Sequence, residues 1–443
     1  MNNHRLLTVL LAAALWSGAV CATTAPRAAR VLTMEEIFEV AEANSLQLRP
    51  SFAAQEEARR EIGVARSERL PEINANLSLS YIGDGFTTDR DFSDYRKAPI
   101  PHMGNALGIS VSQPVYTGGA ITAGIRLAEL RSTAARYATD MRRDDIRFRL
   151  AGFYLDIYKY SNLRAVVEGN LALARKVLAE MDARHVQGVV LRNDITRYEL
   201  LVSDLELQLL KIDNTLDILN GNLTVTAGLP DSILVVPDST ILARALPAAS
   251  EDWWRRTALD NAPALRLART RVEIGRNAER LVKSRRLPSV GLQAGWSMDG
   301  PILTEVPPID RNLSYWYVGV GVSFNLGALY KSDKSLARSR AATFKAVQEL
   351  DAAEEATALD IRADYIRYME AYEELKTRQK AVELADRNYR TVSTRYAEGM
   401  ALVTDMLDAA NARLDAGQRL VNARIDIIYF YYKLLFTSGK LIS

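Results

Sequence analysis

The chain has 443 residues, of which 48% are hydrophobic and 25% charged, so it is neither a disordered tail nor a membrane protein built from many apolar helices. Lys and Arg number 56 against 54 Asp and Glu, without segregation of sign, which argues against a nucleic-acid partner. One cysteine, three histidines and no acid-base or nucleophile constellation leave little for a metal site or an enzyme, and we expect no cofactor.

The N-terminus has the pattern of a secretory signal peptide. His4 and Arg5 precede an apolar run over 6–16, which is too short to span a bilayer, and a cleavage site follows Ala22. We therefore expect residues 1–22 to be removed. A lipid anchor at Cys21 is the less favoured alternative, because Val20 is bulky where a lipoprotein signal has a small residue. Beyond Ala22 no run of 18 apolar residues predicts a membrane-spanning helix.

Proline positions divide the rest of the chain. All fourteen prolines fall within 26–114 and 230–308, and none lies in 115–229 or 309–443. Because an interior proline costs a helix about 3 kcal/mol, these two proline-free tracts predict long helices.

The two tracts are copies of each other. A shift of 211 residues superimposes Tyr154 on Tyr365, Gly188 on Gly399 and Asp194 on Asp405, and a shift of 217 superimposes Pro71 on Pro288. The sequence therefore predicts a signal peptide and two structural repeats joined by an irregular linker: 1–22, 23–228, 229–249 as the linker, and 250–443.

Each repeat predicts one helix, a strand hairpin and a long helical hairpin. The ranges are 33–69, 73–116 and 118–227 in the first repeat, and 250–286, 290–324 and 328–438 in the second. The strands are recognised by alternation of period two, with Ile73, Leu77 and Leu79 on one face and Asn74 and Asn76 on the other. Polar loops over 82–106 and 299–314 join the strands. The turn glycines Gly188 and Gly399 end the first long helices, and Asp194 and Asp405 are expected as N-caps of the returning ones.

Four such strands have the length needed to cross a bilayer at a tilt. Aromatic residues near their ends suit an interfacial girdle: Tyr81, Tyr116, Trp296, Tyr315, Trp316 and Tyr317. Four strands cannot close, and open edges in lipid cost several kcal/mol per unpaired group, so a membrane sheet requires eight strands from a dimer or twelve from a trimer. Half-buried hairpins of a soluble secreted protein are the alternative.

Several motifs occur in a specific order. Val111-Ser112-Gln113-Pro114-Val115-Tyr116-Thr117-Gly118-Gly119 ends a strand, and Tyr396-Ala397-Glu398-Gly399 precedes Asp405-Met406-Leu407-Asp408-Ala409. With these motifs in this order and at this spacing, the chain resembles the TolC-like outer-membrane efflux family over nearly its whole length.

The resemblance implies a mainly α fold with membrane β-strands: a trimeric 12-stranded β-barrel in outer-membrane lipid, continued by a 12-helix coiled-coil tunnel into the periplasm. It further implies a homotrimer that serves as exit duct for an inner-membrane pump and a periplasmic adaptor protein, without catalysis. A duct for type I protein secretion and a secreted coiled-coil scaffold without a pore are the alternatives.

The resemblance also implies roles for four residues of a channel gate. Asp405 and Asp408 match the family's constriction carboxylates, and Asp194 and Tyr396 match positions that link neighbouring helices in the closed state. The simpler alternatives are a capping Asp405, a solvated Asp408 and a packed aromatic at Tyr396. A family arginine is replaced by Ala401, so part of the closing network is absent or rebuilt with Arg192 or Arg395.

The turns themselves carry apolar side chains that a soluble turn rarely exposes. The family assigns this tip to contact with the adaptor, which gives seven candidate residues: Gly188, Val189, Val190, Leu191, Gly399, Met400 and Leu402. The alternative is that these side chains fasten each hairpin to a neighbouring helix.

Overall fold

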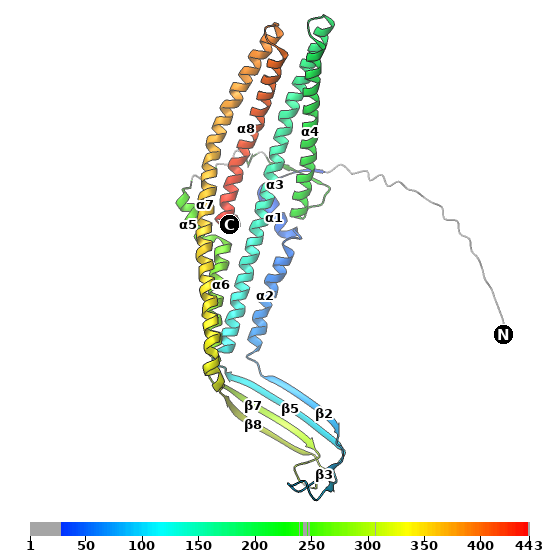
Figure 1. Ribbon diagram of the computed structural model, residues 1–443, viewed down its shortest axis with the longest axis vertical. Coiled ribbons are helices and arrows are strands. Elements are labelled where there is room, and N and C mark those ends of the chain that lie inside the picture. Colours follow the sequence, from blue (N-terminus) through cyan, green and yellow to red (C-terminus); the bar gives the residue numbers. More distant parts are fainter. Residues whose placement is uncertain (1–27, 239, 242–245, 247–248, 306, 442–443) are drawn as a thin grey trace, which may run out of the picture.

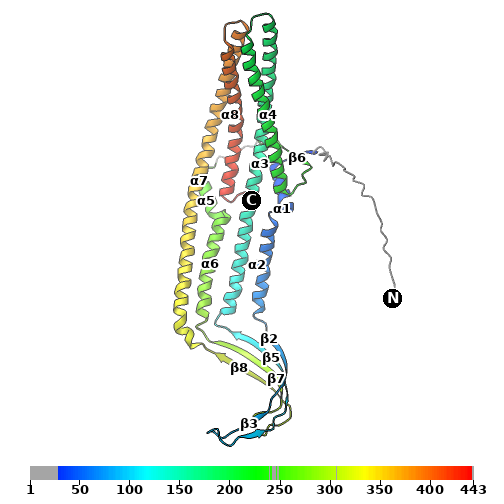
Figure 2. The same ribbon diagram turned by 45° about the vertical axis from the view of Figure 1, so that its right-hand side comes forward.

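The computed structural model describes residues 28–238, 240–241, 246, 249–305 and 307–441. The expected signal peptide and Cys21 lie outside these residues. The molecule is long and narrow, with helices along most of its length and a curved sheet at one end (Figures 1 and 2).

Two very long helices run along the molecule. α3 (Ala120–Val186) has 67 residues and α7 (Leu326–Ala397) has 72, which at 1.5 Å per residue gives each a length of about 100 Å. The shorter α4 (Arg192–Ala227) and α8 (Val403–Thr437) return from the far turns. Beside the halves of the long helices nearer the sheet lie α2 (Arg49–Ser67) and α6 (Pro263–Ser284) (Figure 1). In the described ranges, no helix has an apolar stretch long enough to cross a membrane.

The prediction of a single helix at the start of each repeat is wrong, because each predicted range contains two helices. They are α1 (Met34–Asn44) with α2 (Arg49–Ser67), and α5 (Glu251–Asn261) with α6 (Pro263–Ser284). Pro50 and Pro263 occupy the first turns of α2 and α6, where a missing N–H costs nothing, and a helix cannot continue unbroken into them. Each proline therefore starts a second helix instead of lying inside one.

Four antiparallel strands form the sheet at the other end, in the order β2 (Glu72–Tyr81), β5 (Met103–Tyr116), β7 (Ser289–Gly300) and β8 (Leu313–Ser323). The strands agree with the predicted ones to within a few residues. The loop over 82–106 is more ordered than expected, since β3 (Gly85–Thr87) pairs with β4 (Arg96–Ala98).

The register defines an apolar and a polar face of this sheet. Trp296 lies opposite Trp316, and Gly295 lies opposite Tyr317. Since directly opposed residues point to the same side, Trp316 is on the apolar face, whereas Tyr315 and Tyr317 are on the polar one. The prediction that these two tyrosines belong to an interfacial girdle is therefore wrong; strict alternation separates them from the tryptophan between them.

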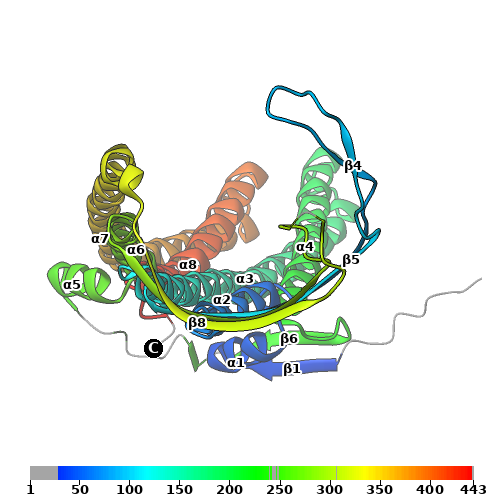
Figure 3. The same cartoon turned by 90° about the horizontal axis from the view of Figure 1, so that it is seen from below.

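The linker between the repeats is not irregular throughout. Its β6 (Ile233–Pro237) forms a parallel pair with β1 (Ala28–Leu32), and the two strands lie next to α1 (Figure 3). β6 also contacts α3. The buried Tyr154 of α3 holds both segments, because its hydroxyl donates to the Leu32 carbonyl at 2.9 Å and accepts from the Asp238 N–H at 2.8 Å.

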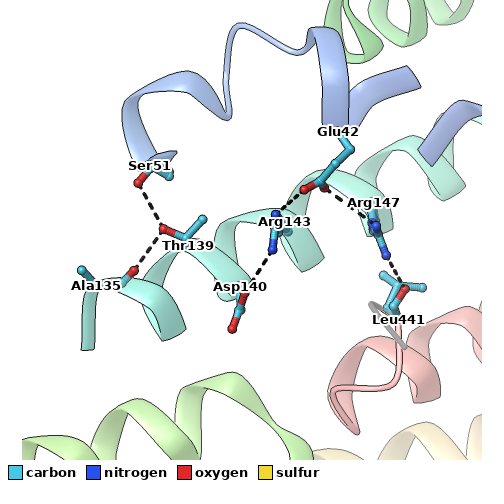
Figure 4. A network of polar contacts seen from close by, with 8 residues as sticks. All are labelled: Glu42, Ser51, Ala135, Thr139, Asp140, Arg143, Arg147 and Leu441. Carbon is cyan, nitrogen blue, oxygen red and sulfur yellow. Dashed lines mark hydrogen bonds and ion pairs between the residues drawn. The ribbon is translucent and has the colours of Figure 1, made fainter. Parts of the chain in front are cut away.

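A polar network at mid-length fastens other segments to α3 (Figure 4). Arg143 and Arg147 of α3 both pair with Glu42 of α1, and Arg147 also donates to the Leu441 carbonyl at 3.0 Å. Thr139 donates to the carbonyl of Ser51 in α2 at 3.1 Å. The first helices and the end of the described chain are thus held at one level of α3.

Candidate functional site

The two helical turns lie at the end of the molecule opposite the sheet (Figure 1). Gly188 and Gly399 have φ of 76° and 73°, a region that favours glycine. The N–H that follows each glycine bonds back into the helix, from Val189 to the Arg184 carbonyl at 3.1 Å and from Met400 to the Arg395 carbonyl at 2.8 Å. Both long helices therefore end in the glycine C-cap expected of them.

Most apolar side chains of the turns face solvent in the single chain. Val189, Leu191, Met400 and Leu402 are 61–72% exposed. Val190 differs, because it packs partly buried against the hydrophobic cluster beneath the turns. Val190 thus fits the alternative role, in which a turn side chain fastens its hairpin to a neighbouring helix. The other four side chains form an apolar surface.

The structure corrects the placement of Asp194 and Asp405. The N-caps are Leu191 and Leu402, and each aspartate is the third residue of its helix. The Asp405 carboxylate accepts a hydrogen bond from the Leu402 N–H at 3.0 Å, which satisfies one free donor of the helix end. The helices begin three residues earlier than expected, and the Asp405 carboxylate supports the cap of α8 from inside its first turn.

Asp405 and Asp408 lie three residues apart, on one face of α8, and both are exposed. Among the residues that the structure describes, Asp408 has no hydrogen-bond or ion-pair partner. The same ranges contain no cluster of three or more His, Cys, Asp or Glu side chains arranged for a metal. The pair can therefore act as an open patch of negative charge.

Tyr396 connects the two hairpins through a residue that the sequence did not single out. The guanidinium of Arg184 lies 5.9 Å from the Tyr396 ring centroid and donates to the Ala397 carbonyl at 3.3 Å. Arg192, one of the two arginines proposed to rebuild this network, pairs instead with Glu199 at 3.3 Å. Under the 211-residue shift Arg184 falls on Arg395, and this match was the signal that could have found it.

Burial and charge act together on Tyr396. Its hydroxyl is buried and has no hydrogen-bond partner in the part of the chain the structure describes. Burial raises the pKa of Tyr396, nearby Arg184 opposes this, and the charge of Asp194 adds to it. The structure thus brings Asp194 and Tyr396 of different hairpins close together, with Arg184 beside them.

Comparisons with known proteins agree with this architecture. A family model described as "Outer membrane efflux protein" matches residues 37–228 and 254–428. The outer membrane protein TolC of Vibrio cholerae is 22% identical over 411 residues, covering 92% of this chain and 91% of TolC. The outer membrane efflux protein BepC of Brucella suis is 23% identical over 384 residues, covering 86% and 79% respectively.

A solved structure has the same fold. The outer membrane protein VceC of Vibrio cholerae superimposes with a TM-score of 0.76 at 16% identity, over 92% of this chain and 96% of VceC. The TolC-like fold expected from the sequence is confirmed, and so is the outer membrane as the location. The chain belongs to the outer membrane efflux protein family.

Proposed function

We propose that three copies of this chain form the exit duct of a tripartite efflux system, which passively conducts small molecules from an inner-membrane pump and a periplasmic adaptor to the exterior. The observation that carries the proposal is the shape of the chain. One end is a membrane-length sheet with one apolar face, and helices of about 100 Å continue from it to two exposed turns.

The sheet supports assembly with further copies. In the described ranges, no strand pairs with the outer edges of β2 and β8, although the apolar side chains of both strands are exposed. In lipid every backbone group needs a partner, so β8 of one copy requires β2 of the next. Because β2 and β8 run in opposite directions, this pairing continues the antiparallel order and allows closure.

The turn end supports a gate and a docking surface. In a trimer the exposed Asp405 and Asp408 form rings of negative charge, which favour cations at a constriction. At the same end of the chain Arg184 contacts Tyr396 between the two hairpins, and the charge of Asp194 acts on Tyr396. The exposed Val189, Leu191, Met400 and Leu402 provide the apolar surface that an adaptor protein would cover.

Planar-bilayer conductance of the purified protein tests this function. We expect small cation-selective steps, and we expect Asp405→Asn/Asp408→Asn to lower the cation-to-anion permeability ratio about threefold or more. Asp415→Asn is the matched control, since Asp415 is also exposed on α8 but pairs with Arg419 at 2.8 Å.

Two results would contradict the proposal in different ways. A correctly assembled protein that remains in the aqueous fraction and never conducts would exclude a duct. Conductance with the same selectivity in the wild type and the double variant would support a duct, but it would show that the two carboxylates do not line its constriction.

A further inference from the structure

The middle of the polar face of the sheet is built from small side chains on three of the four strands. Adjacent positions across β2, β5 and β7 form two rows, Asn76, Gly108 and Ser297, and Asn74, Ser110 and Gly295. Since the opposite face is apolar and suited to lipid, this polar face is the wall of the lumen in the proposed duct.

Two tyrosines interrupt this wall. On β8 the first row ends at Tyr315 and the second at Tyr317. The Tyr317 ring lies directly over Gly295, where a Cβ would be 2.6 Å from the ring. The ring is therefore held flat against the strand, and Gly295 is the residue that permits this close approach.

All charge on the four strands is negative and lies on the same face. β2, β5, β7 and β8 contain two carboxylates, Glu72 and Asp299, and their sequences contain no Lys or Arg. Asp299 accepts a hydrogen bond from the Ser297 hydroxyl at 2.8 Å, and Ser297 is directly opposite Tyr315. One carboxylate thus lies beside the tyrosines toward the outer end, and the other lies toward the helices.

The polar face is also hollowed at its end nearer the helices. A cavity of about 850 Å³ lies where the sheet meets the helices, and its lining includes Glu72, Ser112, Gln293 and Gly321. In the register, Gln293 lies opposite Gly319, and Gly319 is two residues along β8 from Tyr317. A solute that leaves the helical part would enter this hollow before it reaches Tyr317.

We propose that Tyr315 and Tyr317, with Glu72 and Asp299, form a selectivity site on the luminal wall for organic cations that carry an aromatic or quaternary ammonium group. The faces of tyrosine rings attract such cations, and the carboxylates repel anions. The site is distinct from Asp405 and Asp408, which lie near the start of α8, and α8 begins at the end of the molecule opposite the sheet (Figure 1). This inference rests on the proposed duct, because only a closed assembly makes the polar face a lumen.

To test the site, we would add benzyltrimethylammonium from the sheet side and measure how strongly it blocks the potassium current. We expect Tyr315→Ala/Tyr317→Ala to raise the half-blocking concentration about tenfold, and Tyr315→Phe/Tyr317→Phe to leave it within about twofold, since the rings remain. Val318→Ala/Val320→Ala is the control on the apolar face of the same strand. Glu72→Gln/Asp299→Asn is expected to weaken the block as well.

Saturation-transfer NMR of the same proteins in zwitterionic nanodiscs removes the dependence on an open gate. Transfer to the phenyl protons of the probe in the wild type and the phenylalanine variant, with loss in the alanine variant, would support the site. Equal transfer or equal block in the wild type and the alanine variant would overturn it. A tyrosine-dependent NMR signal from a protein that is recovered from cells in the aqueous fraction and never conducts would instead refute the duct and leave the binding site.

Discussion

Asp144 is the most unfavourably placed carboxylate in the described part of α3. It is 3% exposed, and its Oδ1 atom is buried without a hydrogen-bond partner there. Burial raises the pKa of Asp144 to about 7, although Arg147 acts in the opposite direction and Asp140 and Asp145 add to the increase. The folded chain therefore disfavours the charged form that an unfolded chain adopts above pH 4.

This shift predicts how stability depends on pH. As pH rises from about 4 to about 7 the unfolded Asp144 ionises first, so the residue lowers the free energy of unfolding across this range. We expect Asp144→Asn to raise the free energy of unfolding by about 1–3 kcal/mol at pH 8 and to have little effect at pH 4. Thermal unfolding at the two pH values measures the difference.

Asp182→Asn provides the control for this prediction, because Asp182 is exposed on the same helix. It should change the unfolding midpoint equally at both pH values. An Asp144→Asn variant that behaves like Asp182→Asn would show that Asp144 is already charged in the folded protein.

Individual residues also show how far sequence reasoning extends. The sequence alone could have shown which face of β8 carries the two tyrosines, since Tyr315 and Tyr317 alternate in step with Gly319 and Gly321. Only their aromatic character suggested that they belong to a girdle. The contact between Arg184 and Tyr396 was not available, because it joins residues 212 positions apart whose helices meet only after folding. Periodicity reports which face a residue is on, but not what lies opposite it.

At the scale of elements, the Arg184 side chain of α3 touches the end of α7. Its ring contact with Tyr396 and its hydrogen bond to Ala397 together hold the two hairpins at the turn end. We expect Arg184→Ala to lower the free energy that stabilises the contact between the hairpins by about 1 kcal/mol. This loss should raise the open probability of the channel about fivefold in bilayer recordings.

The matched variant is Arg395→Ala, at the equivalent position of the second repeat, because Arg395 is exposed. It should leave the open probability near that of the wild type. Equal changes in the two variants would indicate a general effect of lost positive charge and contradict the specific role of Arg184.

The turns provide a second test at this scale. Gly399→Ala places a side chain in the left-handed region, which costs about 1–2 kcal/mol, whereas Gly169→Ala within α3 has open space around it and should gain up to about 1 kcal/mol. Hydrogen–deuterium exchange of residues 390–405 should accelerate in Gly399→Ala. Exchange of 160–175 should not accelerate in Gly169→Ala, and faster exchange there would contradict the helical position assigned to it.

Long helices and strands were predictable, and short elements were not. The proline-free tracts and the alternation of strands are patterns of many residues, so each determines its element without help from the rest of the chain. β1 and β6 have five residues each, and they form only because residues 205 positions apart pair with each other. No local pattern in Ile233–Pro237 indicates that partner, and its closing proline is typical of a loop.

At the scale of the whole molecule, the open sheet edges decide the assembly. β2 and β8 are separated by two strands, which places them about 14 Å apart within one chain at the usual spacing. Cysteines in β2 and β8 of one chain are therefore too far apart for a disulfide, which requires Cα atoms within about 7 Å. Any disulfide between these two strands must join different chains.

Paired cysteines can thus test both the number of copies and the faces of the sheet. In a Cys21→Ser background we expect Ala75→Cys, combined in turn with Val318→Cys, Val320→Cys and Val322→Cys, to give a ladder that ends at the trimer on a non-reducing gel. At least one register should link, because all four residues lie on the apolar face. Ala75→Cys with Gly319→Cys should fail, since these side chains point to opposite faces. A ladder that ends at the dimer would mean an eight-stranded assembly. Linkage of position 75 to position 319 alone would show that these two side chains share a face, which would contradict the placement of Tyr315 and Tyr317 on the luminal face.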